Sequence, residues 1–133
     1  MIPEIITLWE ENKHKLVEYF RKTDLNKYSS SYSDIVKKLF ELVINTDDVN
    51  YNFQKLRVLN DGYYEGTLIF IAVKNTCQPS VEDYLITNTY YGSCSACDTL
   101  QSISEYGEGL PNEKQVKEFM TLALHLVQKM KRL

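Results

Sequence analysis

The chain has 133 residues, of which 44% are hydrophobic and 25% are charged, and its formal net charge is −3. This length suits one domain that buries its own core, and the composition excludes disordered and collagen-like classes. The longest apolar run, residues 68–73, is far shorter than the roughly 18 residues that a membrane-spanning helix needs. We therefore predict a single domain over residues 1–133 that does not enter a membrane.

Two helices are expected in the first 45 residues. Apolar side chains recur at helical spacing from Pro3, a favoured first-turn residue, to about residue 22. After a polar break, a second apolar set recurs at spacings of three and four from Ile35 to Val43, with Ser33 as the expected N-cap. This second helix should end by Asn45.

Three strands are expected in the middle of the chain. Residues 53–59 partition onto two faces with period two, and the turn signal Asn60-Asp61-Gly62 leads into a long strand over residues 63–74. The second half of that strand is almost continuously apolar, which predicts burial on both faces. A third strand should follow over about residues 82–91, giving a mainly antiparallel sheet of three or four strands.

A long C-terminal helix, residues 112–132, is expected to pack on this sheet, with Asn112 as its N-cap. Its apolar arc is wide, because Leu122, Leu126 and Leu133 lie off the main stripe. Such an arc indicates either a helix wedged between the sheet and another helix, or a second side that forms a homodimer. The predicted fold class is therefore α+β, with two N-terminal helices, the sheet, and the C-terminal helix packed on it.

The segment Gly-Ser-Cys-Ser-Ala-Cys-Asp at residues 92–98 holds two thiols, Cys94 and Cys97, directly behind the third predicted strand. The Cys-x-x-Cys spacing suits half of a tetrahedral zinc site or a thiol–disulfide exchange site. No second cysteine pair supplies further zinc ligands, and no parallel βαβ unit surrounds the motif. We therefore interpret the segment as a tight buried corner in which Asp98 caps a short helical turn. Metal binding or redox chemistry remains the alternative.

The same string, with the strand before it, resembles a segment of small uncharacterised proteins that are common in bacteriophages and mobile elements. The match covers about a tenth of the chain, and Ala96 stands where those proteins would have glycine. The resemblance implies a phage or mobile-element origin and carries no established activity.

Adjacent tyrosines occur twice among the ten in the chain, at Tyr63-Tyr64 and at Tyr90-Tyr91. Neighbours in a strand point to opposite faces, so one member of each pair should leave the helix-packed face. Tyrosine is enriched in protein interfaces because its ring combines apolar area with a hydroxyl. We predict an aromatic binding surface formed by these four tyrosines.

These features predict a small non-enzymatic binding or regulatory protein that is phage-encoded and acts on a host protein in the host cytoplasm. A cytoplasmic location is expected because the N-terminus lacks a secretory signal pattern and the cysteine count is odd. Residues 46–111 carry nine acidic and three basic side chains, a balance that disfavours nucleic acid as the partner. No cofactor is expected; the alternative function is a metal-binding, zinc for instance, or thiol-redox protein centred on Cys94 and Cys97.

Overall fold

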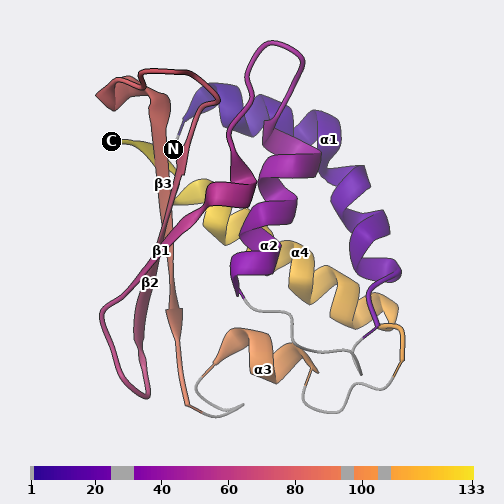
Figure 1. Cartoon of the computed structure of the whole chain (residues 1–133). Coiled ribbons are helices and arrows are strands. Elements are labelled where there is room, and N and C mark those ends of the chain that lie inside the picture. The colour runs from indigo at the N-terminus through magenta and orange to yellow at the C-terminus, as the bar shows by residue number, and fades with distance from the viewer. Residues whose placement is uncertain (1, 25–31, 94–97, 105–108) are drawn as a thin grey trace.

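The computed structural model describes residues 2–24, 32–93, 98–104 and 109–133, and within these residues a four-stranded antiparallel sheet carries helices on one side (Figure 1). The strands, in their order across the sheet, are β1 (Arg57–Asn60), β2 (Gly66–Val73), β3 (Tyr84–Tyr91) and β4 (Lys131–Arg132). The helices are α1 (Pro3–Arg21), α2 (Tyr32–Leu39), which continues into the π-helical segment Phe40–Ile44, α3 (Thr99–Ser104) and α4 (Glu113–Gln128). This arrangement confirms the predicted α+β class. No described helix is both long enough and apolar enough to cross a membrane.

The start of α4 has the predicted cap. The Asn112 side chain accepts a hydrogen bond from the Gln115 backbone N–H at 2.8 Å, and the Gln115 side chain accepts one from the Asn112 backbone N–H at 2.9 Å. This reciprocal capping box satisfies backbone donors that the first turn of a helix otherwise leaves free. Asn112 therefore fixes where the helix begins.

The end of α4 differs from the prediction. The helix stops at Gln128, and Lys131 and Arg132 pair with β3 as strand β4. Met130 is fully buried at this point, so it draws the chain back against the core, where the edge of β3 offers unpaired backbone groups. The two cations thus belong to the sheet instead of extending the helix.

The core lies between the sheet and the helices. Phe70 and Ala72 of β2 and Leu85 of β3 are buried on the helix side, and the Thr87 hydroxyl donates a 2.6 Å hydrogen bond to the Leu126 carbonyl of α4. Further along the helix layer, the rings of Phe20 in α1 and Phe119 in α4 stack with their centroids 4.9 Å apart. Helix and sheet layers are therefore joined by both apolar packing and a buried hydrogen bond.

The predicted burial of β2 on both faces is wrong. Phe70 and Ala72 are buried, whereas Ile69, Ile71 and Val73 alternate with them and remain partly exposed on the opposite face. The described helices all lie on the other side of the sheet, so nothing in the described chain covers this open face (Figure 1). The apolar run therefore reflects two different surroundings, a core on one side and an uncovered sheet on the other.

Three predicted boundaries also need correction. The first strand begins at Arg57, because Phe53–Lys55 forms a 3-10 turn whose Lys55 N–H is bonded to the Asn52 side chain at 3.3 Å. The second strand begins at Gly66, three residues later than predicted. Ser33 does not cap α2, since that helix already includes Tyr32.

The second leucine side of α4 is not available to another subunit. Leu122 and Leu126 are 4% and 1% exposed within the single chain, where α4 packs against α1, α3 and β3. Of the two alternatives that the wide arc left open, the wedged helix is the one observed. The homodimer stays a prediction; of the three leucines that motivated it, Leu122 and Leu126 are buried, whereas Leu133 is exposed.

Candidate functional site

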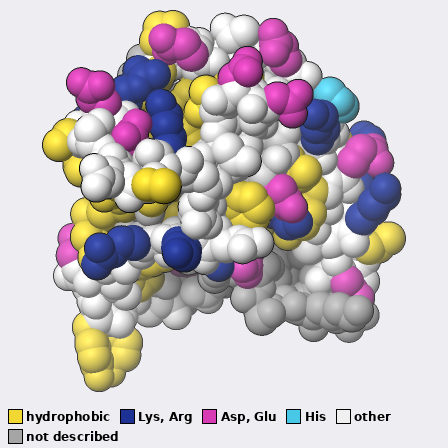
Figure 2. Space-filling model, turned by 45° about the horizontal axis from the view of Figure 1, so that its top comes forward, with side chains coloured by type: hydrophobic (Ala, Val, Ile, Leu, Met, Phe, Trp, Pro, Cys, Tyr) yellow, Lys and Arg dark blue, Asp and Glu magenta, His cyan; other side chains and the backbone are white. Residues whose placement is uncertain are grey.

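Two of the predicted tyrosines lie at the turn between β1 and β2. Tyr63 is 87% exposed and Tyr64 is 73% exposed, and their rings meet edge to face with centroids 4.8 Å apart. Neither belongs to a strand, so both rings leave the body of the sheet instead of dividing between its faces. The turn lies at the lower end of the sheet in Figure 1, and hydrophobic side chains project from the lower left of the molecule in Figure 2.

The other two tyrosines lie beside this turn. Tyr90 and Tyr91 end β3 opposite Thr67 and Gly66, the first residues of β2. Tyr90 is 52% exposed on the open face of the sheet, whereas Tyr91 packs partly buried against the core on the helix side. The structure therefore gathers Tyr63, Tyr64 and Tyr90 on one exposed end of the sheet, which we call the tyrosine surface, and places Tyr91 behind it.

Hydrogen bonds hold the turn in one conformation. The Tyr90 hydroxyl donates to the Glu65 carboxylate at 3.0 Å, and the Tyr91 hydroxyl donates to the Asn60 side chain at 2.6 Å. The Asp61 carboxylate accepts from the Thr67 N–H at 2.6 Å, which closes the base of the turn. The hydroxyls of Tyr90 and Tyr91 and the side chains of the turn thus hold one another in position.

Glycine is required inside the turn at position 62. A Cβ atom built on Gly62 would stand 1.9 Å from the Glu65 carbonyl oxygen. Only a residue without a side chain allows the chain to pass this close to itself. The predicted turn signal Asn60-Asp61-Gly62 is therefore explained by a close backbone approach.

Asp98 caps α3 as predicted. It is 5% exposed, and its Oδ1 atom accepts hydrogen bonds from the Gln101 N–H at 3.0 Å and from the Tyr32 hydroxyl at 2.8 Å. Its Oδ2 atom accepts from the Gly92 N–H at 2.9 Å. The carboxylate therefore joins the end of β3, the start of α3 and the start of α2.

Cys94 and Cys97 lie outside the described residues, so the buried corner and the zinc or redox alternative both stay predictions. The remaining thiol, Cys77, is exposed. Among the residues that the structure does describe, no group of three or more His, Cys, Asp or Glu side chains is placed to hold a metal ion.

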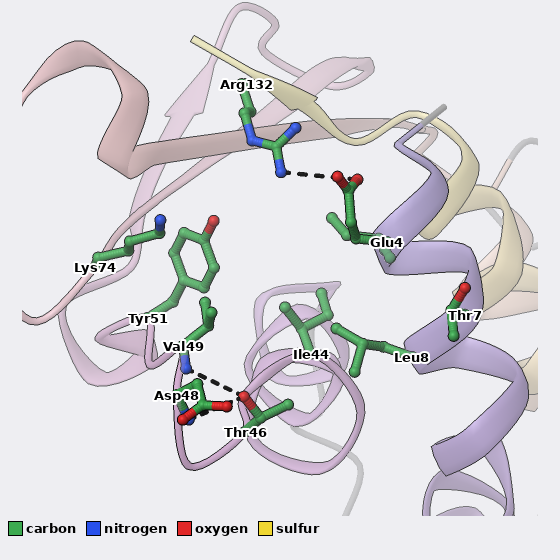
Figure 3. A pocket seen from close by; sticks show the side chains of 11 residues that line it. Glu4, Thr7, Leu8, Ile44, Thr46, Asp48, Val49, Tyr51, Lys74 and Arg132 are labelled. Atoms are coloured by element: carbon green, nitrogen blue, oxygen red, sulfur yellow. Dashed lines mark hydrogen bonds and ion pairs between the residues drawn. The ribbon is translucent and has the colours of Figure 1, made fainter.

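A hollow of about 430 Å³ was not predicted from the sequence (Figure 3). Its lining comes from α1, from the end of the π-helical segment and the loop after it, from the residue after β2 and from β4. Tyr51 forms one wall and is 5% exposed, and burial raises the pKa of its phenol more than the neighbouring Arg132 charge lowers it. The lining residues come from segments far apart in the sequence, so no local motif predicts the hollow.

Comparisons of the chain with known protein families, with curated proteins and with solved structures found no match.

Proposed function

We propose that the protein is a non-enzymatic binding protein that recognises another protein through the tyrosine surface. The observation that carries this proposal is the exposure of Tyr63, Tyr64 and Tyr90, at 87%, 73% and 52%. Exposed large apolar side chains gathered at one place mark interaction sites, and tyrosine is among the residues that dominate binding energy in protein interfaces.

The turn is suited to binding because it is ordered before a partner arrives. Tyr63 and Tyr64 rest against each other, and the hydrogen bond from Tyr90 to Glu65 ties β3 to the turn. Binding a preorganised surface costs less conformational entropy than ordering a loose loop. The rings can therefore enter a pocket on the partner without rearrangement of the turn.

Charge around the turn indicates the chemistry of the partner. Residues 58–73 include Asp61 and Glu65 but neither lysine nor arginine. Such a surface repels the phosphates of a nucleic acid and complements a basic protein surface. The proposed partner is a protein whose apolar groove has lysine or arginine at its rim. If the chain has the phage origin that residues 92–98 imply, that partner belongs to the host and the protein acts in the host cytoplasm.

Site-specific crosslinking tests this proposal. We would place the photoreactive analogue p-benzoylphenylalanine at position 63 and, as a control, at position 81, where Val81 is 63% exposed beside the opposite end of β3. In a bacterial host lysate we expect a protein that crosslinks from position 63 and not from position 81. Mass spectrometry identifies the crosslinked protein, which can then be purified for affinity measurements.

The affinity measurement uses matched surface variants. Tyr63→Ser/Tyr64→Ser should weaken binding of that partner by about tenfold or more, because two interface aromatics are removed. Val81→Ser/Leu133→Ser removes two other exposed apolar side chains and should bind like the wild type. Equal binding by both double variants would overturn the proposal. So would a dimer of the chain itself that Tyr63→Ser/Tyr64→Ser abolishes, since the occupant of the surface would then be a second copy.

A further inference from the structure

We propose that the hollow beside Tyr51 binds a small carboxylate with an apolar tail, a site separate from the tyrosine surface and independent of its function. Figure 3 shows Lys74 and Arg132 at the end of the hollow to which the hydroxyl of Tyr51 points, with Ile44 and Leu8 further inside. The site thus has an end that carries hydrogen-bond donors from two ion-paired cations and a phenol, and an apolar interior.

Three donors at this end make no side-chain hydrogen bond to the described residues, although Lys74 and Arg132 are each ion-paired there. The Tyr51 residue is 5% exposed, and no buried side-chain oxygen among the described residues is without a partner, so its unbonded hydroxyl opens onto the hollow. The nearest carboxylate oxygens, from Asp83 to the Lys74 ammonium and from Glu4 to the Arg132 guanidinium, are each 3.9 Å away within the described chain. These contacts are ion pairs but too long for hydrogen bonds, so the N–H groups of Lys74 and Arg132 can still donate to a ligand.

The backbone places the first two donors together. Tyr51 and Lys74 face each other across an isolated antiparallel bridge, which the hydrogen bond from the Asn52 N–H to the Val73 carbonyl at 2.8 Å supports. Residues that are directly opposite in such a bridge project their side chains on the same side. The phenol and the ammonium therefore approach the hollow as a pair, and β4 brings Arg132 to it from the other direction.

The charges and the lining select the class of ligand. Lys74 and Arg132 are balanced by Asp83 and Glu4, and Asp48 also lines the hollow, so it suits a singly charged carboxylate better than a doubly charged phosphate. A carboxylate has lone pairs enough to accept from all three donors. The interior is lined by Ile5, Leu8, Ile44 and Val49. These side chains would cover an aliphatic tail, and the volume lies within the range of small-molecule sites.

Octanoate is the probe that tests this site, with acetate as the head group alone and octylamine as the same tail with the opposite charge. Isothermal titration should give saturable octanoate binding, and acetate should bind about tenfold or more weakly because it buries no tail. Octylamine should bind no better than acetate, because an ammonium cannot accept from the three donors at the end of the hollow; tighter binding would show that Glu4 and Asp48 set the preference instead. Nuclear Overhauser contacts from the octanoate chain to the methyl groups of Ile44 and Leu8 would place it in this hollow.

Variants separate the site from general charge effects. Tyr51→Phe, Lys74→Gln and Arg132→Gln should each weaken octanoate binding by about tenfold, the usual effect of losing a hydrogen bond to a charged group. Lys131→Gln is the matched control, because Lys131 neighbours Arg132 in β4 but does not line the hollow. Octylamine binding as tight as octanoate, an equal loss in Lys131→Gln, or no contact to Ile44 and Leu8 would each overturn the proposal. None of these results bears on the tyrosine surface.

Discussion

The Tyr32 hydroxyl donates a 2.8 Å hydrogen bond to the Asp98 carboxylate, and both residues are buried. The same hydroxyl accepts a hydrogen bond from the Leu100 N–H at 3.1 Å. Tyr32 is the first residue of α2, and Asp98 immediately precedes α3, so this pair connects segments 66 residues apart in the sequence. In each hydrogen bond that Asp98 makes to the described residues its oxygens accept, so this position needs an acceptor on both oxygens.

Asp98→Asn should therefore lower the free energy of unfolding by about 2 kcal/mol. The amide nitrogen of asparagine is a donor, and in either orientation it would face an N–H group that now donates to a carboxylate oxygen. Urea unfolding at neutral pH measures the change. Glu11→Gln, which removes an exposed charge in α1, is the control and should leave stability within about 0.5 kcal/mol of the wild type. Equal stability of the two variants would show that the carboxylate is not needed at this position.

The turn that carries the tyrosine surface gives a second prediction. Gly62→Ala places a methyl group 1.9 Å from the Glu65 carbonyl oxygen, so the turn must open. We expect a loss of stability of about 1–3 kcal/mol and faster amide hydrogen exchange in β1 and at the start of β2. Gly109→Ala is the comparison, because Gly109 has a φ of 70° but, apart from its chain neighbours, no atom of the described residues lies within 4 Å of the new methyl group.

Gly109→Ala should lose about 1–2 kcal/mol from its left-handed backbone and leave exchange in β1 unchanged. If Gly62→Ala also leaves exchange in β1 unchanged, the close approach of Gly62 to Glu65 does not hold the turn.

Local patterns in the sequence predicted the elements that local forces determine. The helical repeat of α1, the Asn112 cap of α4 and the Asp98 cap of α3 each depend on residues within a few positions of one another. Strand β4 has only two residues and no strand pattern, because it forms where buried Met130 returns the chain to the edge of β3. It could not be recognised without the fold.

The two candidate sites also differ in whether local sequence predicts them. Tyr63 and Tyr64 are neighbours in sequence and remain neighbours on the surface, so the sequence predicts their pairing. The hollow draws Glu4, Tyr51, Lys74 and Arg132 from four distant segments, and none of them has an unusual sequence context. Its polar end exists only because sheet pairing brings Tyr51 opposite Lys74.

The pH dependence of stability should reveal the buried phenol of Tyr51. Burial raises its pKa above the ordinary value of 10.0, and the charge of Arg132 only partly opposes this. Above about pH 10 the unfolded chain loses this proton while the folded chain keeps it, so the free energy of unfolding falls as pH rises through the folded pKa. The contribution of the protonated Tyr51 phenol to the free energy of unfolding is therefore fully present below pH 10.

Tyr51→Phe removes this titration and is the reference. Urea unfolding at pH 9, 10 and 11 should show the wild type losing stability relative to Tyr51→Phe as pH rises. A constant difference between the two proteins across this range would mean that the phenol titrates alike in the folded and unfolded chains.

The last prediction compares two leucines that the sequence places off the main apolar stripe of the C-terminal segment, because only the fold distinguishes them. Leu122 is 4% exposed within the chain, whereas Leu133 is 56% exposed after β4. Leu122→Ala should cost about 2–5 kcal/mol of stability through lost burial and a residual cavity, and Leu133→Ala less than about 0.5 kcal/mol. Urea unfolding at several protein concentrations measures both. A midpoint for Leu122→Ala that depends on concentration, with a wild-type dimer in light scattering, would show that this side of α4 meets a second subunit instead of its own core.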